Sequence, residues 1–280
     1  MILITGATGT IGSEVVRQLA AAGEPVRAMT RNPSGASFPD GVEVVAGDFE
    51  DGASLERAVR GATAVFALSG AGPAIPGHDR ALIGAATAAG VRRVVKLSSI
   101  GMKGAEPPFW HEAGEQAARE SGLGWTFLRP SAFASNALAW AAAIRAGEPV
   151  PDRYGAGRMG VVDPRDIAAV AVRALTSDEH QGRAYTLTGP ELLSAADQAA
   201  VLSEELGRTV TTAEMPLETI REQMLGFHSD AGFAEQIMEG IREVREGRNA
   251  VLTEDVARVL GRPATGFAQW VRDHRDAFTG

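Results

Sequence analysis

Cysteine is absent from this chain of 280 residues, and lysine and tyrosine are scarce. Without cysteine the chain can form no disulfide, no thiolate nucleophile and no cysteine-ligated metal site. A reducing compartment fits this composition, and we expect a cytoplasmic protein. The only lysines are Lys96 and Lys103, and the only tyrosines are Tyr154 and Tyr185. This scarcity limits the catalytic pairs that the chain can form.

Long apolar runs and an excess of positive charge are also missing. The longest clearly apolar stretch, 137–144, has eight residues, whereas a membrane-spanning helix needs about 20. The 27 basic and 35 acidic residues give a net charge of −8. Nucleic acids and anionic membranes attract clustered positive charge, so we expect neither as a partner. The first residues already read as a buried strand, so we expect no signal peptide.

Short apolar runs alternate with helical patterns in the first half of the chain. The runs are apolar throughout, which is typical of strands covered on both faces. They lie at 1–5, 25–29, 42–46, 64–68, 94–97 and 125–128. The helical patterns lie at 11–22, 54–60, 78–89 and 111–120. This order predicts an α/β fold with a doubly wound parallel sheet of the Rossmann type.

The second half is less regular and predicts a smaller, mostly helical C-terminal substrate lobe. We expect short strands at 161–162 and 184–187, a helix from 163 to 175, mostly helix from 194 onwards, and an extended segment at 210–213. The predicted dinucleotide-binding domain comprises residues 1–135 and 161–189. The predicted substrate-binding lobe comprises residues 136–160 and 190–280.

A glycine-rich segment, GATGTIG at 6–12, stands between the first strand and the first helix. Gly6 permits a tight turn, Gly9 lets the backbone approach a pyrophosphate, and Gly12 lets the helix pack against the strand. The start of the helix supplies free N–H groups to the phosphates. The alternative is a glycine-rich turn with no ligand. The cofactor contacts expected in this loop are Gly6, Thr8, Gly9, Thr10, Ile11 and Gly12.

The end of the second strand predicts which dinucleotide binds. NAD enzymes usually place an acidic residue there, but this chain has Arg31. A guanidinium suits the extra 2′-phosphate of NADP(H), unless Arg31 is a solvated loop residue. Asp48 and Phe49 follow the third strand, where a carboxylate could meet the adenine amino group or simply end the strand. We also include Leu68, Ser69 and Pro130 among the expected cofactor contacts.

Several motifs together resemble the short-chain dehydrogenase/reductase superfamily, and in particular its atypical NmrA-like branch. They are TGATGTIG at 5–12, TRNP at 30–33, GDFED at 47–51, LSSIG at 97–101, SGLGWTFLRPSAFASN at 121–136, GVVDPRDIA at 160–168 and GRPATGFAQWVRDH at 261–274. The resemblance implies an NADP(H)-binding Rossmann fold. The branch includes NADPH-dependent quinone and dye reductases as well as NADP-sensing regulators, so the substrate is poorly specified.

The Tyr-x-x-x-Lys pair of conventional members of that superfamily is missing. Arg92 and Ser99 stand four residues before the two lysines. The resemblance implies that His111 takes the lysine position and Pro107 the tyrosine position. His111 could then bind substrate or ribose and donate a proton near neutral pH. Alternatively, it lies at an exposed helix start with Glu115 as its partner.

Other candidates for the reacting end are two serines and a set of apolar side chains. Ser98 and Ser99 follow the fifth strand, where one could donate a hydrogen bond to a carbonyl or both could merely end the strand. Apolar side chains could form the wall of a substrate pocket, or could belong to the core. They are Leu68, Phe109, Trp110, Phe133 and Trp140.

The loss of the tyrosine favours an acceptor that needs little acid catalysis. A quinone, enone or dye spreads the incoming charge over its own π-system, so that orientation matters more than a placed acid. We therefore expect an NADPH-dependent oxidoreductase of small conjugated acceptors. The alternatives are a non-catalytic NADP(H) sensor that binds a protein partner and a tailoring ketoreductase of secondary metabolism. A homodimer is compatible with the sequence, and no residue spacing resembles a metal site.

Overall fold

A seven-stranded, fully parallel sheet forms the centre of the computed structural model, which describes residues 1–70, 72–101, 107–227 and 230–280, without the side chains of Phe109 and Phe227. The strand order is β3-β2-β1-β4-β5-β6-β9. The strands are β1 (Ile2–Ile4), β2 (Val26–Thr30), β3 (Glu43–Ala46), β4 (Ala64–Ala67), β5 (Arg93–Leu97), β6 (Gly124–Pro130) and β9 (Arg183–Leu187). All six strands predicted in the first half belong to this sheet, as does the strand predicted at 184–187.

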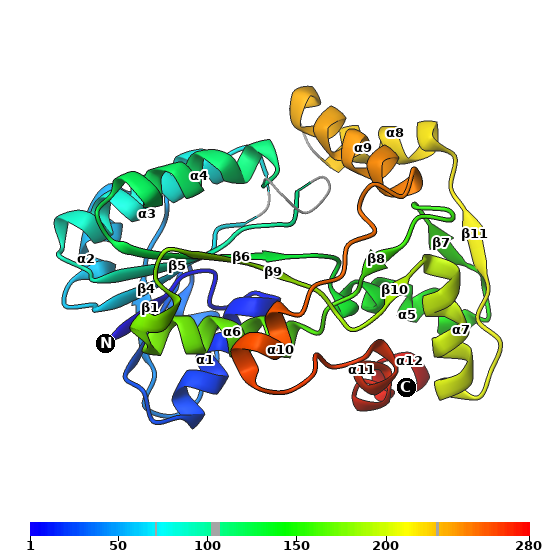
Figure 1. The fold of residues 1–280 in the computed structure, drawn as a ribbon, viewed down its shortest axis with the longest axis horizontal. Helices are drawn as coiled ribbons and strands as arrows, with labels where there is room; N and C mark the ends of the chain where they lie inside the picture. The colour runs from blue at the N-terminus through cyan, green and yellow to red at the C-terminus, as the bar shows by residue number, and fades with distance from the viewer. Residues whose placement is uncertain (71, 102–106, 228–229) are drawn as a thin grey trace.

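Helices cover both faces of the sheet, as the doubly wound prediction requires (Figure 1). On one face lie α1 (Thr10–Ala21) and α6 (Pro164–Thr176). On the other lie α2 (Gly52–Val59), α3 (Ile75–Ala88) and α4 (Phe109–Glu120). Each face has its own apolar cluster, because the side chains of successive strand residues point to opposite sides. The α/β fold is therefore confirmed.

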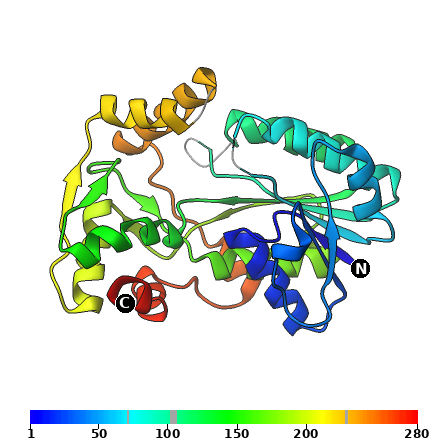
Figure 2. The same cartoon turned by 180° about the vertical axis from the view of Figure 1, so that it is seen from behind.

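The C-terminal elements gather beyond one end of the sheet, away from the N terminus (Figures 1 and 2). Two small sheets lie here, one pairing β7 (Val150–Asp152) with β11 (Thr212–Glu214) and one pairing β8 (Met159–Gly160) with β10 (Leu192–Leu193). The helices of this region are α5 (Ala141–Ala146), α7 (Ala195–Leu206), α8 (Leu217–Phe227), α9 (Ala231–Arg245), α11 (Phe267–Asp273) and α12 (Asp276–Thr279). Along the described chain, short 3-10 helices occur at Pro33–Gly35, Ala134–Trp140 and Asp178–His180.

The short strand predicted at 161–162 is misplaced. The strand lies at Met159–Gly160, where it pairs with β10. Val162 instead makes an isolated bridge to Phe133, because its N–H donates to the Ala132 carbonyl (2.8 Å) and its carbonyl accepts from the Ala134 N–H (2.9 Å). Val161 and Val162 are apolar, but this pattern alone did not show that β10 would pair with the two residues before them.

The boundary between the two predicted domains stays a prediction. One apolar cluster of the C-terminal region is separate from the sheet and includes Trp270 and Phe278. A smaller cluster holds α8 and α9 together through Ile220 and Met238. However, α10 (Asp255–Leu260), which the predicted lobe contains, returns to the main sheet, where Val256 packs in the cluster around α1 and α6.

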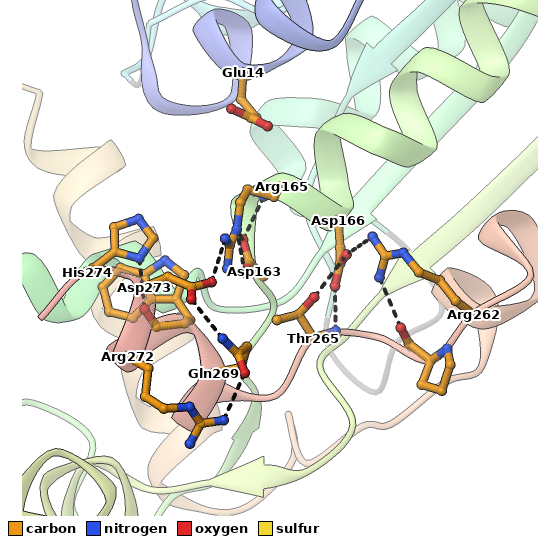
Figure 3. Close-up of polar contacts among 12 residues, drawn as sticks. Glu14, Asp163, Arg165, Asp166, Arg262, Thr265, Gln269, Arg272, Asp273 and His274 are labelled. Atoms are coloured by element: carbon orange, nitrogen blue, oxygen red, sulfur yellow. Dashed lines mark hydrogen bonds and ion pairs between the residues drawn. The ribbon is translucent and has the colours of Figure 1, made fainter. Parts of the chain in front are cut away.

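A network of hydrogen bonds and ion pairs connects residues 262–273 to the start of α6 (Figure 3). Asp163 caps the helix by accepting the Arg165 N–H (2.8 Å), and Arg165 also pairs with Asp273 (2.7 Å). Asp166, completely buried, accepts hydrogen bonds from Arg262 and from the Thr265 N–H, both at 2.6 Å. The DPRD motif at 163–166 is thus a helix start, as its residues suggested, and it also joins two distant parts of the chain.

Two negative findings apply to the part of the chain that the structure describes. None of its helices combines the length and the apolar character needed to cross a membrane. It contains no group of three or more His, Asp or Glu side chains that could hold a metal ion.

Candidate dinucleotide and acceptor site

A cleft of about 920 Å³ opens at the carboxyl ends of the central strands. This edge of a parallel sheet, where the strand order reverses, is where α/β proteins usually bind ligands. Most of the predicted cofactor residues line it: Gly6, Thr8, Gly9, Thr10, Ile11, Arg31, Asp48, Phe49, Leu68 and Ser69. The lining also includes Thr30, Asn32, His78, Leu97 and Phe133. Gly12 and Pro130 do not line it, and neither do His111, Ser98 and Ser99.

The glycine loop has the close contacts that its spacing predicts. Gly6 has a φ of +60°, and a Cβ there would lie 2.8 Å from the Leu68 side chain. A Cβ on Gly12 would lie 2.1 Å from the Gly6 carbonyl oxygen, and one on Gly9 would lie 3.3 Å from that oxygen. Gly12 therefore lets the helix pack on the loop from behind the cleft, whereas Gly6 and Gly9 face it.

Helix α1 begins with backbone N–H groups that have no partner among the described residues. Its first intrahelical bond runs from the Ser13 N–H to the Gly9 carbonyl (2.9 Å). The N–H groups of Thr10, Ile11 and Gly12 come before that bond and have no partner in the helix. No acidic residue stands in the first turn. The positive end of the helix dipole therefore meets the cleft without a competing carboxylate.

The Thr5 hydroxyl fixes the strand end that faces this loop. It accepts the Leu68 N–H (2.9 Å) and lies within donating distance of the Phe66 and Leu68 carbonyls (3.0 and 2.9 Å). Thr5 is completely buried. The contact holds Leu68 against Gly6 at the floor of the cleft.

Arg31 is an exposed cation on the wall of the cleft. In the described part of the chain no carboxylate pairs with it, although most other arginines have such a partner. A free guanidinium at the end of β2 has the charge and geometry to bind a 2′-phosphate. Together with the free donors of α1, it makes the cleft fit NADP(H).

Phe49 and His78 stack on each other at one end of the cleft, with ring centroids 4.9 Å apart and planes 17° from parallel. Both His78 nitrogens are buried without a hydrogen-bond partner in the described structure, and Nε2 lies 3.8 Å from a Glu50 carboxylate oxygen. Asp48 accepts the Glu50 N–H (3.0 Å). The sequence indicated only a helix start at His78. No local pattern links it to Phe49, 29 positions earlier in the chain.

A cluster of the buried Asp79 and Lys96 and the half-buried His111 lies outside the cleft lining. The Lys96 ammonium is 2.6 Å from the Asp79 carboxylate, and the two side chains are 1% and 2% exposed. His111 Nδ1 lies 3.3 Å from the same ammonium. A Cβ on Gly114 would come within 2.1 Å of the Asp79 carboxylate, so this glycine lets α3 and α4 close over the pair. The sequence argument missed this cluster because its members come from α3, β5 and α4.

His111 lies at the start of α4, as one of the two expectations had it, but it is half-buried and not exposed. Burial, together with the positive charge of Lys96, lowers the pKa of His111 to about 3. The imidazole is therefore neutral at physiological pH, and the idea that it supplies a proton near neutrality loses its support. The alternative partner was also wrong, because His111 contacts Lys96 and not Glu115.

Glu115 is instead the centre of a second buried network. It is completely buried and binds the Arg129 guanidinium through both oxygens, at 2.9 and 2.6 Å. The Ser98 hydroxyl donates to the same carboxylate (2.7 Å), and Arg119 donates to it as well (2.8 Å). Ser98 therefore already uses its proton. Within the described residues Ser99 makes only a long contact to the Ile100 carbonyl (3.4 Å), so its hydroxyl is the more available of the two.

The predicted apolar walls divide between two cavities. Leu68 and Phe133 line the cleft, and Phe133 also lines a second cavity of about 530 Å³, together with Trp140. Trp110 is half-buried, and its ring packs edge-to-face with Phe233 on α9, with ring centroids 5.5 Å apart. The side chain of Phe109 lies outside the described residues. Because Phe133 lines both cavities, they adjoin at this residue.

The comparisons with known proteins agree with this geometry. The family described as NAD(P)H-binding matches residues 6–178. The chain is 42% identical to the (4-alkanoyl-5-oxo-2,5-dihydrofuran-3-yl)methyl phosphate reductase of Streptomyces griseus, and 38% identical to the NAD(P)H azoreductase of Xenophilus azovorans. Each alignment covers 99% of both chains.

A solved structure shares the whole architecture. It is the NADPH-dependent quinone oxidoreductase of Escherichia coli, crystallised with NADPH, and it superimposes with a TM-score of 0.82 at 26% identity. The superposition covers 98% of this chain and 100% of that one. The resemblance to the NmrA-like branch and the expectation of NADP(H) are therefore confirmed.

Proposed function

This chain belongs to the NAD(P)H-binding family, and we propose that it is an NADPH-dependent oxidoreductase that transfers hydride to a small conjugated acceptor, such as a quinone, an enone or an azo dye. One observation carries the proposal: the cleft joins a glycine loop and an unpaired Arg31 to a second cavity with aromatic walls. The similar proteins are named as reductases of an unsaturated furanone phosphate, of azo compounds and of quinones.

We assign the cofactor contacts from the shape and charge of the cleft. The free N–H groups at the start of α1 bind the pyrophosphate, and Gly6 and Gly9 allow its close approach. Arg31 binds the 2′-phosphate. Asp48 and Phe49 flank the adenine end, where we add His78, whose unpartnered ring nitrogens and stacked plane suit a base. Leu68 and Ser69 follow the cofactor toward the reacting end.

The chemistry at the reacting end depends more on orientation than on acid catalysis. When bound, NADPH supplies a hydride. No tyrosine and no lysine line the described part of the cleft. The protein holds the acceptor flat against Phe133 and keeps it close to the cofactor, and the acceptor delocalises the negative charge until water protonates it. Of the two serines, Ser99 has the more available hydroxyl, because Ser98 is already committed to Glu115, but neither serine lines the cleft.

Steady-state turnover tests the proposal directly. Purified protein is mixed with NADPH and a panel of quinones, azo dyes and unsaturated ketones, and NADPH oxidation is followed by its absorbance. We expect turnover of several conjugated acceptors and little with isolated ketones. Calorimetry measures NADPH binding in parallel. Tight binding with no turnover on any acceptor would identify a sensor, and activity confined to isolated ketones would identify a ketoreductase.

The proposal also covers the cellular setting. We propose a cytoplasmic protein that acts on a small molecule and binds neither nucleic acid nor membrane, with support from the net charge of −8 and the absence of cysteine. A homodimer remains part of the proposal, and sedimentation measures it.

A further inference from the structure

The second cavity has an aromatic side and a polar side. Phe133 and Trp140 contribute the aromatic surface. Asn136, Arg153 and Gln198 contribute polar groups from three different segments of the chain. An apolar pocket with a few converging polar groups is the usual form of a site that binds a small molecule in one orientation.

Arg153 is a half-buried cation in this cavity without a carboxylate partner in the described structure. The one hydrogen bond of its guanidinium is long, 3.4 Å from Nη2 to the amide oxygen of Gln223 on α8. A buried or half-buried charge is costly unless a counter-charge or hydrogen bonds compensate for it. The guanidinium therefore has most of its donors available for a ligand.

Two carboxylates on the paired strands β7 and β11 are already engaged. Asp152 is buried, and its Oδ1 accepts the N–H groups of Tyr154 (2.8 Å) and Gly155 (2.9 Å). Glu214, on the neighbouring strand β11, pairs with Arg245 (3.1 Å). Neither forms an ion pair with Arg153, so its positive charge acts on the cavity.

Gln198 gives a second, independent sign of a ligand. Its side chain lines the cavity and makes no hydrogen bond within the described residues, although the residue is only 8% exposed. An amide can donate and accept, so it can bind a phosphate or carboxylate oxygen. Tyr154 lines the same cavity, and burial raises the pKa of its hydroxyl, which stays protonated and able to donate.

We propose that Arg153 binds an oxyanion carried by the acceptor, so that this enzyme selects conjugated substrates with a phosphate, carboxylate or sulfonate group. The inference rests on the proposed reductase function and defines its substrate class. The oxyanion lies near Arg153 and Gln198, and the conjugated part lies against Phe133, the residue common to both cavities. Two fixed contacts at opposite ends orient the acceptor for hydride transfer.

Matched acceptors test this assignment. The same quinone skeleton is used in neutral form and with a carboxylate, a sulfonate or a phosphomonoester. Wild-type protein is compared with Arg153→Gln, Arg153→Lys and the control Arg158→Gln, whose arginine is exposed and paired with Asp197 in the same region. Binding of each acceptor to the NADP⁺-loaded protein is also measured by calorimetry, which does not require turnover.

We expect Arg153→Gln to raise the KM of the charged quinones by roughly 10- to 100-fold, as loss of a charge-assisted hydrogen bond predicts. The KM of the neutral quinone and kcat at saturation should change less than about threefold, Arg153→Lys should recover part of the loss, and Arg158→Gln should resemble wild type. The charged acceptor that suffers the largest loss identifies the natural oxyanion.

Equal effects of Arg153→Gln on neutral and charged quinones would overturn the inference while leaving the reductase function intact. So would a wild-type protein without preference for the charged forms. If no quinone is turned over, the reductase function fails, and the calorimetric arm still decides whether Arg153 binds the oxyanion.

Discussion

The dinucleotide cleft and the cluster of Asp79, Lys96 and His111 differ in how their polar groups are paired. In the cleft, Arg31, the ring of His78 and the first N–H groups of α1 have no strong partner in the described structure. In the cluster, Lys96 has a carboxylate at 2.6 Å and a histidine nitrogen at 3.3 Å. Unpaired polar groups around a cavity indicate a ligand, whereas paired ones in the interior hold the protein in shape.

The two regions therefore illustrate two kinds of important residue, those that bind a ligand and those that stabilise the fold. The cleft meets its ligand directly, so changes there should alter affinity and leave the fold intact. The Asp79–Lys96–His111 cluster meets no cavity that we describe, so changes there should alter stability first. The following predictions test whether the two regions separate in this way.

The largest effect is expected from Asp79→Asn, which leaves the buried ammonium of Lys96 without its counter-charge. Removing one partner of a buried ion pair costs about 3–5 kcal/mol in the free energy of unfolding. Urea denaturation measures that loss. Adding Lys96→Met to the variant should recover much of it, because the unpaired charge is then gone.

An exposed ion pair provides the control for this loss. Glu239→Gln breaks a pair with Arg242 in which both side chains are at least 36% exposed, and should cost less than about 1 kcal/mol. If Asp79→Asn were no more costly than Glu239→Gln, the cluster would not be a structural element.

The second effect comes from the junction of the glycine loop and α1, where Gly12→Ala should lower both the free energy of unfolding and the affinity for NADPH. The new Cβ would lie 2.1 Å from the Gly6 carbonyl oxygen, so α1 must move away from the loop. Overpacking of this kind costs about 1–3 kcal/mol, and displaced donors should weaken NADPH binding at least tenfold. Denaturation and calorimetry measure the two losses.

Gly84→Ala is the matched control, because this glycine is inside helix α3 and a Cβ there meets nothing within 4 Å. It should raise the free energy of unfolding by about 0.5–1 kcal/mol. NADPH affinity should not change. An equal loss in both variants would show that the clash with the Gly6 carbonyl is not the cause of the damage in Gly12→Ala.

The cleft could be predicted from the sequence because short segments determine it. Gly6, Gly9 and Gly12 act on one another within seven residues, and Arg31 follows directly from a strand end. Strands and helices were predicted to within a few residues for the same reason. A parallel sheet then brings its strand ends to one edge without further information.

The acceptor end could not be predicted in this way because its contacts join distant segments. Lys96 was visible only as half of a missing Tyr-x-x-x-Lys pair, and its true partner, Asp79, is 17 positions away on another element. Arg153 and Gln198 share a cavity although 45 positions separate them. Neither hydrophobic periodicity nor residue spacing predicts contacts between segments so far apart in the chain.

A smaller and more selective effect is expected from Arg31→Gln. If the guanidinium binds the 2′-phosphate, its loss should weaken NADPH binding by roughly 10- to 100-fold, and NADH binding by less than about threefold. Arg57→Gln, in an exposed ion pair with Asp51, is the control. Equal losses for both dinucleotides would assign Arg31 to some other part of the cofactor, and no loss would make it a solvated loop residue.

The last effect concerns pH, and it decides whether His111 belongs with the cluster or with the cleft. The folded protein keeps His111 neutral until about pH 3, whereas the unfolded chain binds a proton near the ordinary value of 6.5. As the pH falls through this window the unfolded state gains protons, so the stability contributed by the neutral ring is lost, by at most about 1.4 kcal/mol per pH unit. The stability difference between wild type and His111→Gln should shrink accordingly, while kcat should show no step that depends on His111 between about pH 8 and about pH 6. A step near neutrality that the variant abolishes would mean that His111 ionises during turnover and acts on the reaction itself.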